Sequence, residues 1–213
     1  MPWLSQVSAV LEAWYPGQRG GEAIANILFG AVNPSGKLPI TFPASVSDLP
    51  HPEIAGSPNA GTPFPVAYSE GLLVGYKWYD AKHITPAFSF GFGLSYTTFS
   101  FSNFNVVNSR VTFDVTNTGS VSGAEVAQVY VALPASTGEP PKRLVGWQKV
   151  FLQPGAQQEV TIAISANDPS HPLSWWDVTS NSWQTAAGDY PVYVGNSSSA
   201  ANLTLAGTFH VGS

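Results

Sequence analysis

The sequence predicts a mainly β protein in which an immunoglobulin-like antiparallel sandwich follows a partial α/β segment. Apolar and polar residues alternate in short runs from about residue 97 onward, which is the period of a half-buried strand. Turn-forming groups such as Asn117-Thr118-Gly119 and Gln153-Pro154-Gly155 separate these runs. Roughly seven short strands in about a hundred residues is typical of such a sandwich.

Residues 1–45 predict two helices. In the first, apolar residues recur at helical spacing from Trp3 to Trp14, before Pro16-Gly17 ends the segment. The second covers Glu22 to Phe29, and Gly30 is placed to cap it.

One strand is predicted at residues 37–42, after the turn at residues 33–36. Because one strand cannot form a sheet, residues 1–45 predict only a portion of an α/β layer. Residues 46–96 predict an extended linker rich in proline and aromatic residues. Six prolines lie between Pro43 and Pro65, and no helical or strand period is visible there.

Residues 97–213 predict one sandwich domain built from nine candidate strands. These are Phe99–Val107, Arg110–Asn117, Glu125–Ala132, Leu144–Leu152, Gln158–Ile164, Leu173–Asp177, Ser182–Thr185, Tyr190–Gly195 and Thr204–His210. Period-2 placement predicts that seven side chains point into the core: Val126, Val129, Val131, Val160, Ile162, Val192 and Val194.

The composition excludes several classes of function. A net charge of −5 with only 8 Lys and Arg argues against nucleic-acid binding, which needs clustered cations. With no cysteine, the chain has no disulfide, thiolate nucleophile or zinc–thiolate site. The first residues have no basic start and include Glu12, so they predict no signal peptide, and no apolar run predicts a membrane helix. We therefore expect a soluble chain.

Five motifs occur in order along the chain: AWYPGQRGGEAIANILFGAVNPSGKLPITFP, YSEGLLVGYKWYD, FSFGFGLSYTTFSF, GAEVAQVYV and PPKRLVGWQKVFLQPG. Together they resemble glycoside hydrolase family 3, the β-glucosidase and β-xylosidase family, from about Trp3 to about Val211. The resemblance implies a longer enzyme with a barrel, an α/β sandwich domain and a fibronectin type III-like domain. This chain then corresponds to the end of the α/β domain, the linker and the fibronectin type III-like sandwich.

The resemblance also implies where the chemistry lies. Retaining glycosidases need two carboxylates about 5–5.5 Å apart. In this family the nucleophilic Asp comes from the barrel and the acid/base Glu from an earlier part of the α/β domain, and neither motif occurs here. We therefore assign no catalytic residue, expect no cofactor, and expect a β-glucoside as the partner of the complete enzyme. Family members are often secreted or periplasmic.

Glu70, Tyr76 and Trp78 are the candidate substrate-binding residues. Glu70 beside aromatic residues fits a carboxylate that faces a sugar site and whose pKa is raised by apolar neighbours. The commoner alternative is a loop carboxylate that accepts backbone hydrogen bonds or pairs with Lys77. Asp80 has the same two interpretations.

Two further sites are weighed and not assigned. His51, Glu53 and His83 lack the spacing of a metal site, so we predict no metal. Ser95 lies in Gly93-Leu94-Ser95-Tyr96, which lacks the last glycine of the Gly-x-Ser-x-Gly elbow. Because a catalytic triad is recognised by geometry and not by sequence, an esterase-like independent hydrolase stays an alternative.

A third group, Trp175, Trp176 and Trp183, fits two roles. These residues fit a sugar-stacking face, as in a carbohydrate-binding or protein-interaction module, or a hairpin in which one Trp of each strand points to the core. Core packing is the commoner fate of Trp in a sandwich. Finally, an uncovered helix face and strand edge in residues 1–45 predict a homo-oligomer through that segment.

Overall fold

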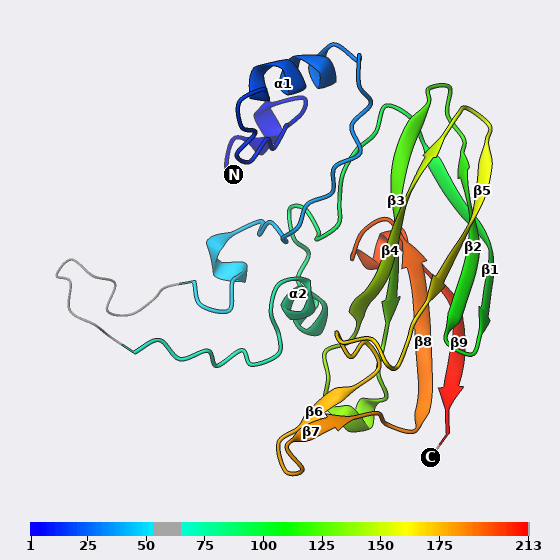
Figure 1. Cartoon of the computed structure of the whole chain (residues 1–213). Coiled ribbons are helices and arrows are strands. Elements are labelled where there is room, and N and C mark those ends of the chain that lie inside the picture. Colours follow the sequence, from blue (N-terminus) through cyan, green and yellow to red (C-terminus); the bar gives the residue numbers. More distant parts are fainter. Residues whose placement is uncertain (53–64, 213) are drawn as a thin grey trace.

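The computed structural model describes residues 1–52 and 65–212 (Figure 1). Seven strands form two antiparallel sheets packed face to face, and two short strands form a separate hairpin. The three-stranded sheet has the order β1 (Phe99–Val107), β2 (Arg110–Asn117), β5 (Gln157–Ala163). The four-stranded sheet has the order β4 (Arg143–Leu152), β3 (Gly123–Val131), β8 (Gly188–Gly195), β9 (Leu203–Val211), and the hairpin pairs β6 (Trp175–Asp177) with β7 (Ser182–Gln184). The predicted sandwich is confirmed, with all nine strands near their expected positions.

The core lies between the two sheets. Phe113 of β2, Val129 of β3 and Tyr190 of β8 are almost completely buried there. Six of the seven side chains expected to point inward are buried, which the alternation of the strands explains. The exception is Val126, which is half-buried, because Ala127, Val129 and Val131 supply the core face of β3.

β3 is buried on both of its faces. Gln128 and Tyr130 alternate with the core residues, yet they are 3% and 0% exposed. Their face of the sheet is covered by the chain around α2 (Tyr76–Lys82) and by the segment that follows α2 (Figure 1). The four-stranded sheet therefore lies between the core and a second layer of chain.

The first predicted helix is wrong. Only Leu4–Gln6 form a 3₁₀ turn, and Trp3, Leu11 and Trp14 are 44–49% exposed. Helices of about 12–15 residues or fewer are marginal without tertiary packing of their apolar face. The helical spacing at Trp3–Trp14 has no such packing within the part of the chain that the structure describes.

The second predicted helix is confirmed as α1 (Gly20–Leu28). Gly30 follows it with a φ of 76°, the left-handed conformation that ends many helices. The predicted strand at 37–42 is wrong. Residues 38–42 make some backbone hydrogen bonds to residues 87–92, but these form a single isolated bridge between Phe42 and Phe88 and no continuous ladder. Pro39 lacks the N–H that a regular ladder needs.

The predicted linker is more ordered than its composition indicates. α2 was not predicted, since seven residues are too few to show a helical period. Gly75 precedes it with a φ of 60°, a conformation that glycine adopts without strain. The boundaries at residues 45/46 and 96/97 stay a prediction. Neither described helix is long and apolar enough to cross a membrane.

We predict that Phe113→Ala lowers the free energy of unfolding by about 3–5 kcal/mol, because Phe113 is 1% exposed and its removal leaves a cavity. The matched control is Phe151→Ala on β4, where the ring is 63% exposed and the expected change is within about 0.5 kcal/mol. Urea denaturation of both variants measures the difference. Equal losses would contradict this placement of the core.

Candidate functional site

The docked segment, residues 76–96, lies against the outer face of the four-stranded sheet. The Tyr76 ring stacks on Phe90 with ring centroids 5.1 Å apart, and it meets Tyr130 edge-on at 5.8 Å. The Tyr76 hydroxyl also accepts a hydrogen bond from the backbone N–H of Leu144 on β4, at 2.8 Å. Tyr76 is therefore held by aromatic contacts and by a backbone donor at once.

Gln128 holds the docked segment through its side-chain amide, whose oxygen and nitrogen are both hydrogen-bonded. Its Nε2 donates to the carbonyl oxygens of Gly91 at 3.1 Å and Asn196 at 2.8 Å, and its Oε1 accepts from the Tyr130 hydroxyl at 2.6 Å. A Cβ at Gly91 would clash with the Gln128 amide, which explains the glycine at this position. A buried amide with all these partners specifies one alignment of the two layers.

Two largely buried ion pairs lie beside the contact between the docked segment and the four-stranded sheet. Lys37 Nζ lies 2.6 Å from Glu125, and their side chains are 12% and 5% exposed. Asp80 of α2 pairs with Lys142, and burial raises the pKa of Asp80 although Lys142 opposes that change. Each pair is held by the fold, and removal of one partner would leave a buried charge.

A groove of about 660 Å³ runs between α2, residues 84–92 and the loop at residues 198–202. Tyr79, which is 6% exposed, and Thr41 line it with hydroxyl groups that have no hydrogen-bond partner among the described residues. Asp80 lines the groove as well, but its carboxylate is committed to Lys142.

Glu70 pairs with a histidine and not with Lys77. His51 Nε2 lies 2.6 Å from the Glu70 carboxylate, whose side chain is 11% exposed. The hydrogen bond from His51 and a backbone hydrogen bond lower the pKa of Glu70. The expectation of a raised pKa is therefore wrong, and a carboxyl group that ionises this readily is poorly suited to protonate a leaving group.

Trp78 also has a structural partner. Its indole Nε1 donates to the carbonyl oxygen of Asp48 at 2.8 Å, and Lys82 Nζ lies over the ring at 5.1 Å from the centroid. The structure thus places Glu70, Tyr76 and Trp78 in one region, but Tyr76 packs against the sheet while Trp78 and Glu70 hold the chain near Asp48 and His51. Their role in substrate binding stays a prediction.

The two unassigned sites gain no support. Glu53 lies outside the described residues, and among those described no group of three His, Asp or Glu side chains is placed to hold a metal ion. The Ser95 hydroxyl donates to the Asn33 amide oxygen at 2.9 Å. No serine hydroxyl is hydrogen-bonded to a histidine within residues 1–52 and 65–212.

The predicted packing of tryptophans into the core is wrong for Trp176 and Trp183. Trp176 and Trp183 are directly opposite each other across β6 and β7, and they are 43% and 46% exposed. Trp175, on the other face of the hairpin, is half-buried. A two-stranded hairpin can bury only one of its faces here, and the tryptophan pair lies on the open one.

Comparison with known proteins identifies the architecture. The Glycosyl hydrolase family 3 C-terminal domain matches residues 1–96, and a Fibronectin type III-like domain matches residues 125–198. The chain belongs to glycoside hydrolase family 3. This family 3 chain corresponds to the C-terminal portion of its relatives, as the sequence motifs indicated.

The relatives are much longer than this family 3 chain. Beta-glucosidase B of Emericella nidulans is 42% identical over 211 residues, which cover 92% of this chain and 24% of that protein. Beta-glucosidase 3B of Thermotoga neapolitana, solved in complex with α-D-glucose, is 39% identical with a TM-score of 0.88. The match covers 100% of this chain and 29% of that structure. The chain thus spans about a quarter of the length of its curated relatives.

Sequence reasoning missed Gln128, Tyr130 and Glu125, which hold the docked segment. The available signal was β3 itself, GAEVAQVYV, where a glutamine and a tyrosine interrupt the apolar run of a central strand. Large side chains on both faces of a strand indicate burial on both sides.

We predict that Tyr76→Phe lowers the free energy of unfolding by about 1 kcal/mol, because the N–H of Leu144 loses its acceptor while the ring contacts remain. Tyr68→Phe is the control, since Tyr68 is 79% exposed and its change should have no measurable effect. Denaturant titration of the two variants decides. If they lose the same amount, the Leu144 hydrogen bond has no role in stability.

We predict that acid weakens the contribution of Glu70. Because the folded-state pKa of Glu70 lies below its ordinary value, the unfolded chain binds the proton more readily, and stability is lost as the pH falls through that lowered pKa. The melting temperature of the chain should exceed that of Glu70→Gln at pH 7, and the gap should narrow when the measurement is repeated in acid, below the ordinary pKa of a glutamate. For the control Glu159→Gln, which changes an exposed carboxylate on β5, any gap should be small at both pH values. A Glu70 gap that widens in acid would contradict the assignment.

Proposed function

We propose that this chain serves as the C-terminal portion of a family 3 β-glucosidase, and that it completes the enzyme by packing against the remainder of the protein. The docked segment and the sandwich form the rigid part. The carboxylates that cleave the glycosidic bond lie outside these 213 residues, and the substrate is a β-glucoside. The observation that carries the proposal is the apolar surface of the first 96 residues.

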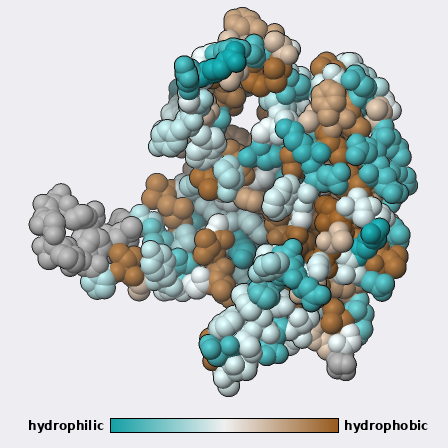
Figure 2. Space-filling model, in the orientation of Figure 1, coloured by the Kyte–Doolittle hydropathy of each residue, from teal (hydrophilic) through white to brown (hydrophobic). Residues whose placement is uncertain are grey.

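Exposed apolar side chains concentrate in that half of the chain. Of 26 exposed large hydrophobic side chains among the described residues, 18 lie before residue 97. They include Tyr15 at 100% and Phe29 at 88%, and Figure 2 shows hydrophobic surface over the α1 region and beside α2. A soluble protein rarely exposes so much apolar surface unless a partner covers it. A chain that spans a quarter of its relatives' length has an evident occupant for this surface, namely the remainder of the enzyme.

The carboxylates of the chain support the second half of the proposal. Twelve of the 13 Asp and Glu side chains lie in the described residues, and 11 of these accept a hydrogen bond or an ion pair from the chain itself. The remaining one, Glu159, is exposed on β5. A glycosidase needs one acid and one free carboxylate facing a single bond. The observed pattern is that of structural carboxylates.

The test uses the complete enzyme and an aryl β-glucoside. We predict that the complete enzyme hydrolyses it, that the 213-residue chain alone does not, and that Phe29→Asp in the complete enzyme greatly lowers both turnover and melting temperature. A charge buried without a partner explains the loss. Val178→Asp, at an 82% exposed position beside β6, is the matched control and should leave both unchanged. Turnover by the chain alone would overturn the proposal.

Without the remainder of the enzyme, the same surface is expected to associate with a second copy through residues 1–45. Sedimentation velocity of the 213-residue chain should show a dimer or larger species, and Phe29→Asp should shift it toward monomer. A compact monomer at all concentrations would show that this surface does not drive self-association.

A further inference from the structure

Two rings of the β6–β7 hairpin and one ring of the loop before it form an aromatic cluster, which we call the Trp platform: Trp176, Trp183 and His171. The imidazole of His171 stacks on Trp183, with centroids 4.4 Å apart and an angle of 16° between the rings. Trp176 and Trp183 meet edge to face at 5.4 Å and 76°. The three side chains therefore form one continuous surface.

Much of this surface is open to solvent. The His171 stack and the edge-to-face contact account for two of the four indole faces. The two tryptophan residues remain 43% and 46% exposed. Indole rings that only stabilised a hairpin would gain more by turning these areas inward.

Arg143 of β4 ties the backbone of the platform to the four-stranded sheet. Arg143 of β4, with a side chain that is 16% exposed, donates to the carbonyl oxygens of His171 at 3.3 Å and Ser174 at 2.8 Å. Glu139 pairs with the same guanidinium. His171 itself has a φ of 51°, a left-handed conformation that is uncommon for a non-glycine residue and that sets the direction of its ring.

Asp168 is linked to the platform through the backbone of His171. Asp168 is exposed, and its carbonyl oxygen accepts from the N–H of His171 at 2.9 Å. Hydrogen bonds from the Ser170 hydroxyl and N–H lower the pKa of Asp168, which is therefore an ionised acceptor at neutral pH. Flat apolar rings beside polar acceptors suit a ligand that has one apolar face and a rim of hydroxyl groups.

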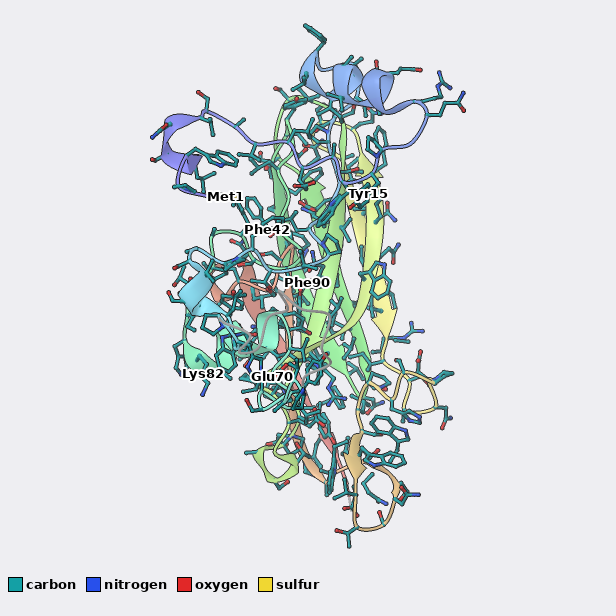
Figure 3. The ribbon with its side chains drawn as sticks, turned by 90° about the vertical axis from the view of Figure 1, so that its left-hand side faces the viewer. Met1, Tyr15, Phe42, Glu70, Lys82 and Phe90 are labelled. Atoms are coloured by element: carbon teal, nitrogen blue, oxygen red, sulfur yellow. The ribbon has the colours of Figure 1, made fainter. Side chains whose placement is uncertain are left out.

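The platform lies far from the apolar surface around α1. α1 lies at one end of the molecule and β6–β7 at the other, in two views at right angles (Figure 1 and Figure 3). The exposed side chains around α1 and those of the hairpin therefore do not form one patch.

We infer that the Trp platform binds an oligosaccharide of glucopyranose type, with the C–H face of a sugar ring stacked on indole. A pyranose with equatorial hydroxyl groups has a flat apolar face, whose C–H groups complement the negative face of an indole ring. Its hydroxyl groups extend sideways and can hydrogen bond to polar side chains of the loop that carries His171, such as Asp168. The inference concerns binding alone, and it does not depend on the hydrolytic role proposed above.

Isothermal titration calorimetry of the 213-residue chain with cellohexaose tests the inference. We expect saturable binding that weakens at least about tenfold in Trp176→Ala and in Trp183→Ala. Trp147→Ala is the matched control, since this tryptophan of β4 is 67% exposed and should be dispensable for binding. Absence of saturable binding by the unaltered chain would overturn the inference, as would an equal loss in all three variants.

A second pair of variants separates binding from folding of the hairpin. Trp176→Phe and Trp183→Phe keep the cross-strand aromatic pair while they reduce the stacking area. Affinities between those of the unaltered chain and the alanine variants, at an unchanged melting temperature, support the platform. Full affinity in both phenylalanine variants would show that stacking area is irrelevant and would contradict it. Failure of the proposed hydrolytic role would appear separately, as lost turnover in the complete enzyme.

Discussion

Gln128 and Tyr130 are buried on the face of β3 that points away from the sandwich core, and the rest of the structure depends on how that face is covered. A buried amide and a buried phenol cost free energy unless their polar atoms are paired. Tyr130 donates to Gln128, the docked segment supplies the Gly91 carbonyl as an acceptor for Gln128, and the Tyr76 ring covers Tyr130. Close approach of the two layers then requires glycine at Gly91, where any side chain would clash with Gln128. Residues 76–96 are therefore part of the folded unit with the sandwich.

This constraint separates what the sequence predicts from what it does not. The strands were predictable because period-2 alternation and turn residues are local, and α1 was predictable from its spacing and from Gly30. The first helix was wrong because Trp3 to Trp14 shows the right spacing without a surface to pack on, and spacing alone cannot show that. α2 and the rest of the docked segment were missed for the opposite reason, since their order comes from contacts with β3, which lies far along the chain: Gly91 is 37 positions from Gln128, and Tyr76 is in contact with Tyr130.

The candidate site followed the same division. Glu70 was found because a carboxylate among aromatic residues is visible in the sequence, but its partner His51 lies 19 positions away, beyond a proline-rich stretch, and reverses the expected direction of its pKa shift. The family was evident from five motifs, and the matches to both domains confirm it. The structural carboxylates and the apolar surface of residues 1–96 are the observations that support the proposed function, and the β6–β7 hairpin carries an exposed tryptophan pair.

Hydrogen–deuterium exchange of the 213-residue chain tests most directly whether the docked segment and the sandwich fold as one unit. The N–H of Ser198, which donates across the contact to the Phe90 carbonyl at 2.8 Å, and the N–H of Gly91, which donates to the Leu38 carbonyl at 2.8 Å, should be protected to a similar degree as those of β2 and β3. Peptides that cover residues 76–93 should then exchange on the timescale of the core strands. Fast exchange of these peptides beside a fully protected β2 and β3 would show that the segment opens independently and would contradict the account.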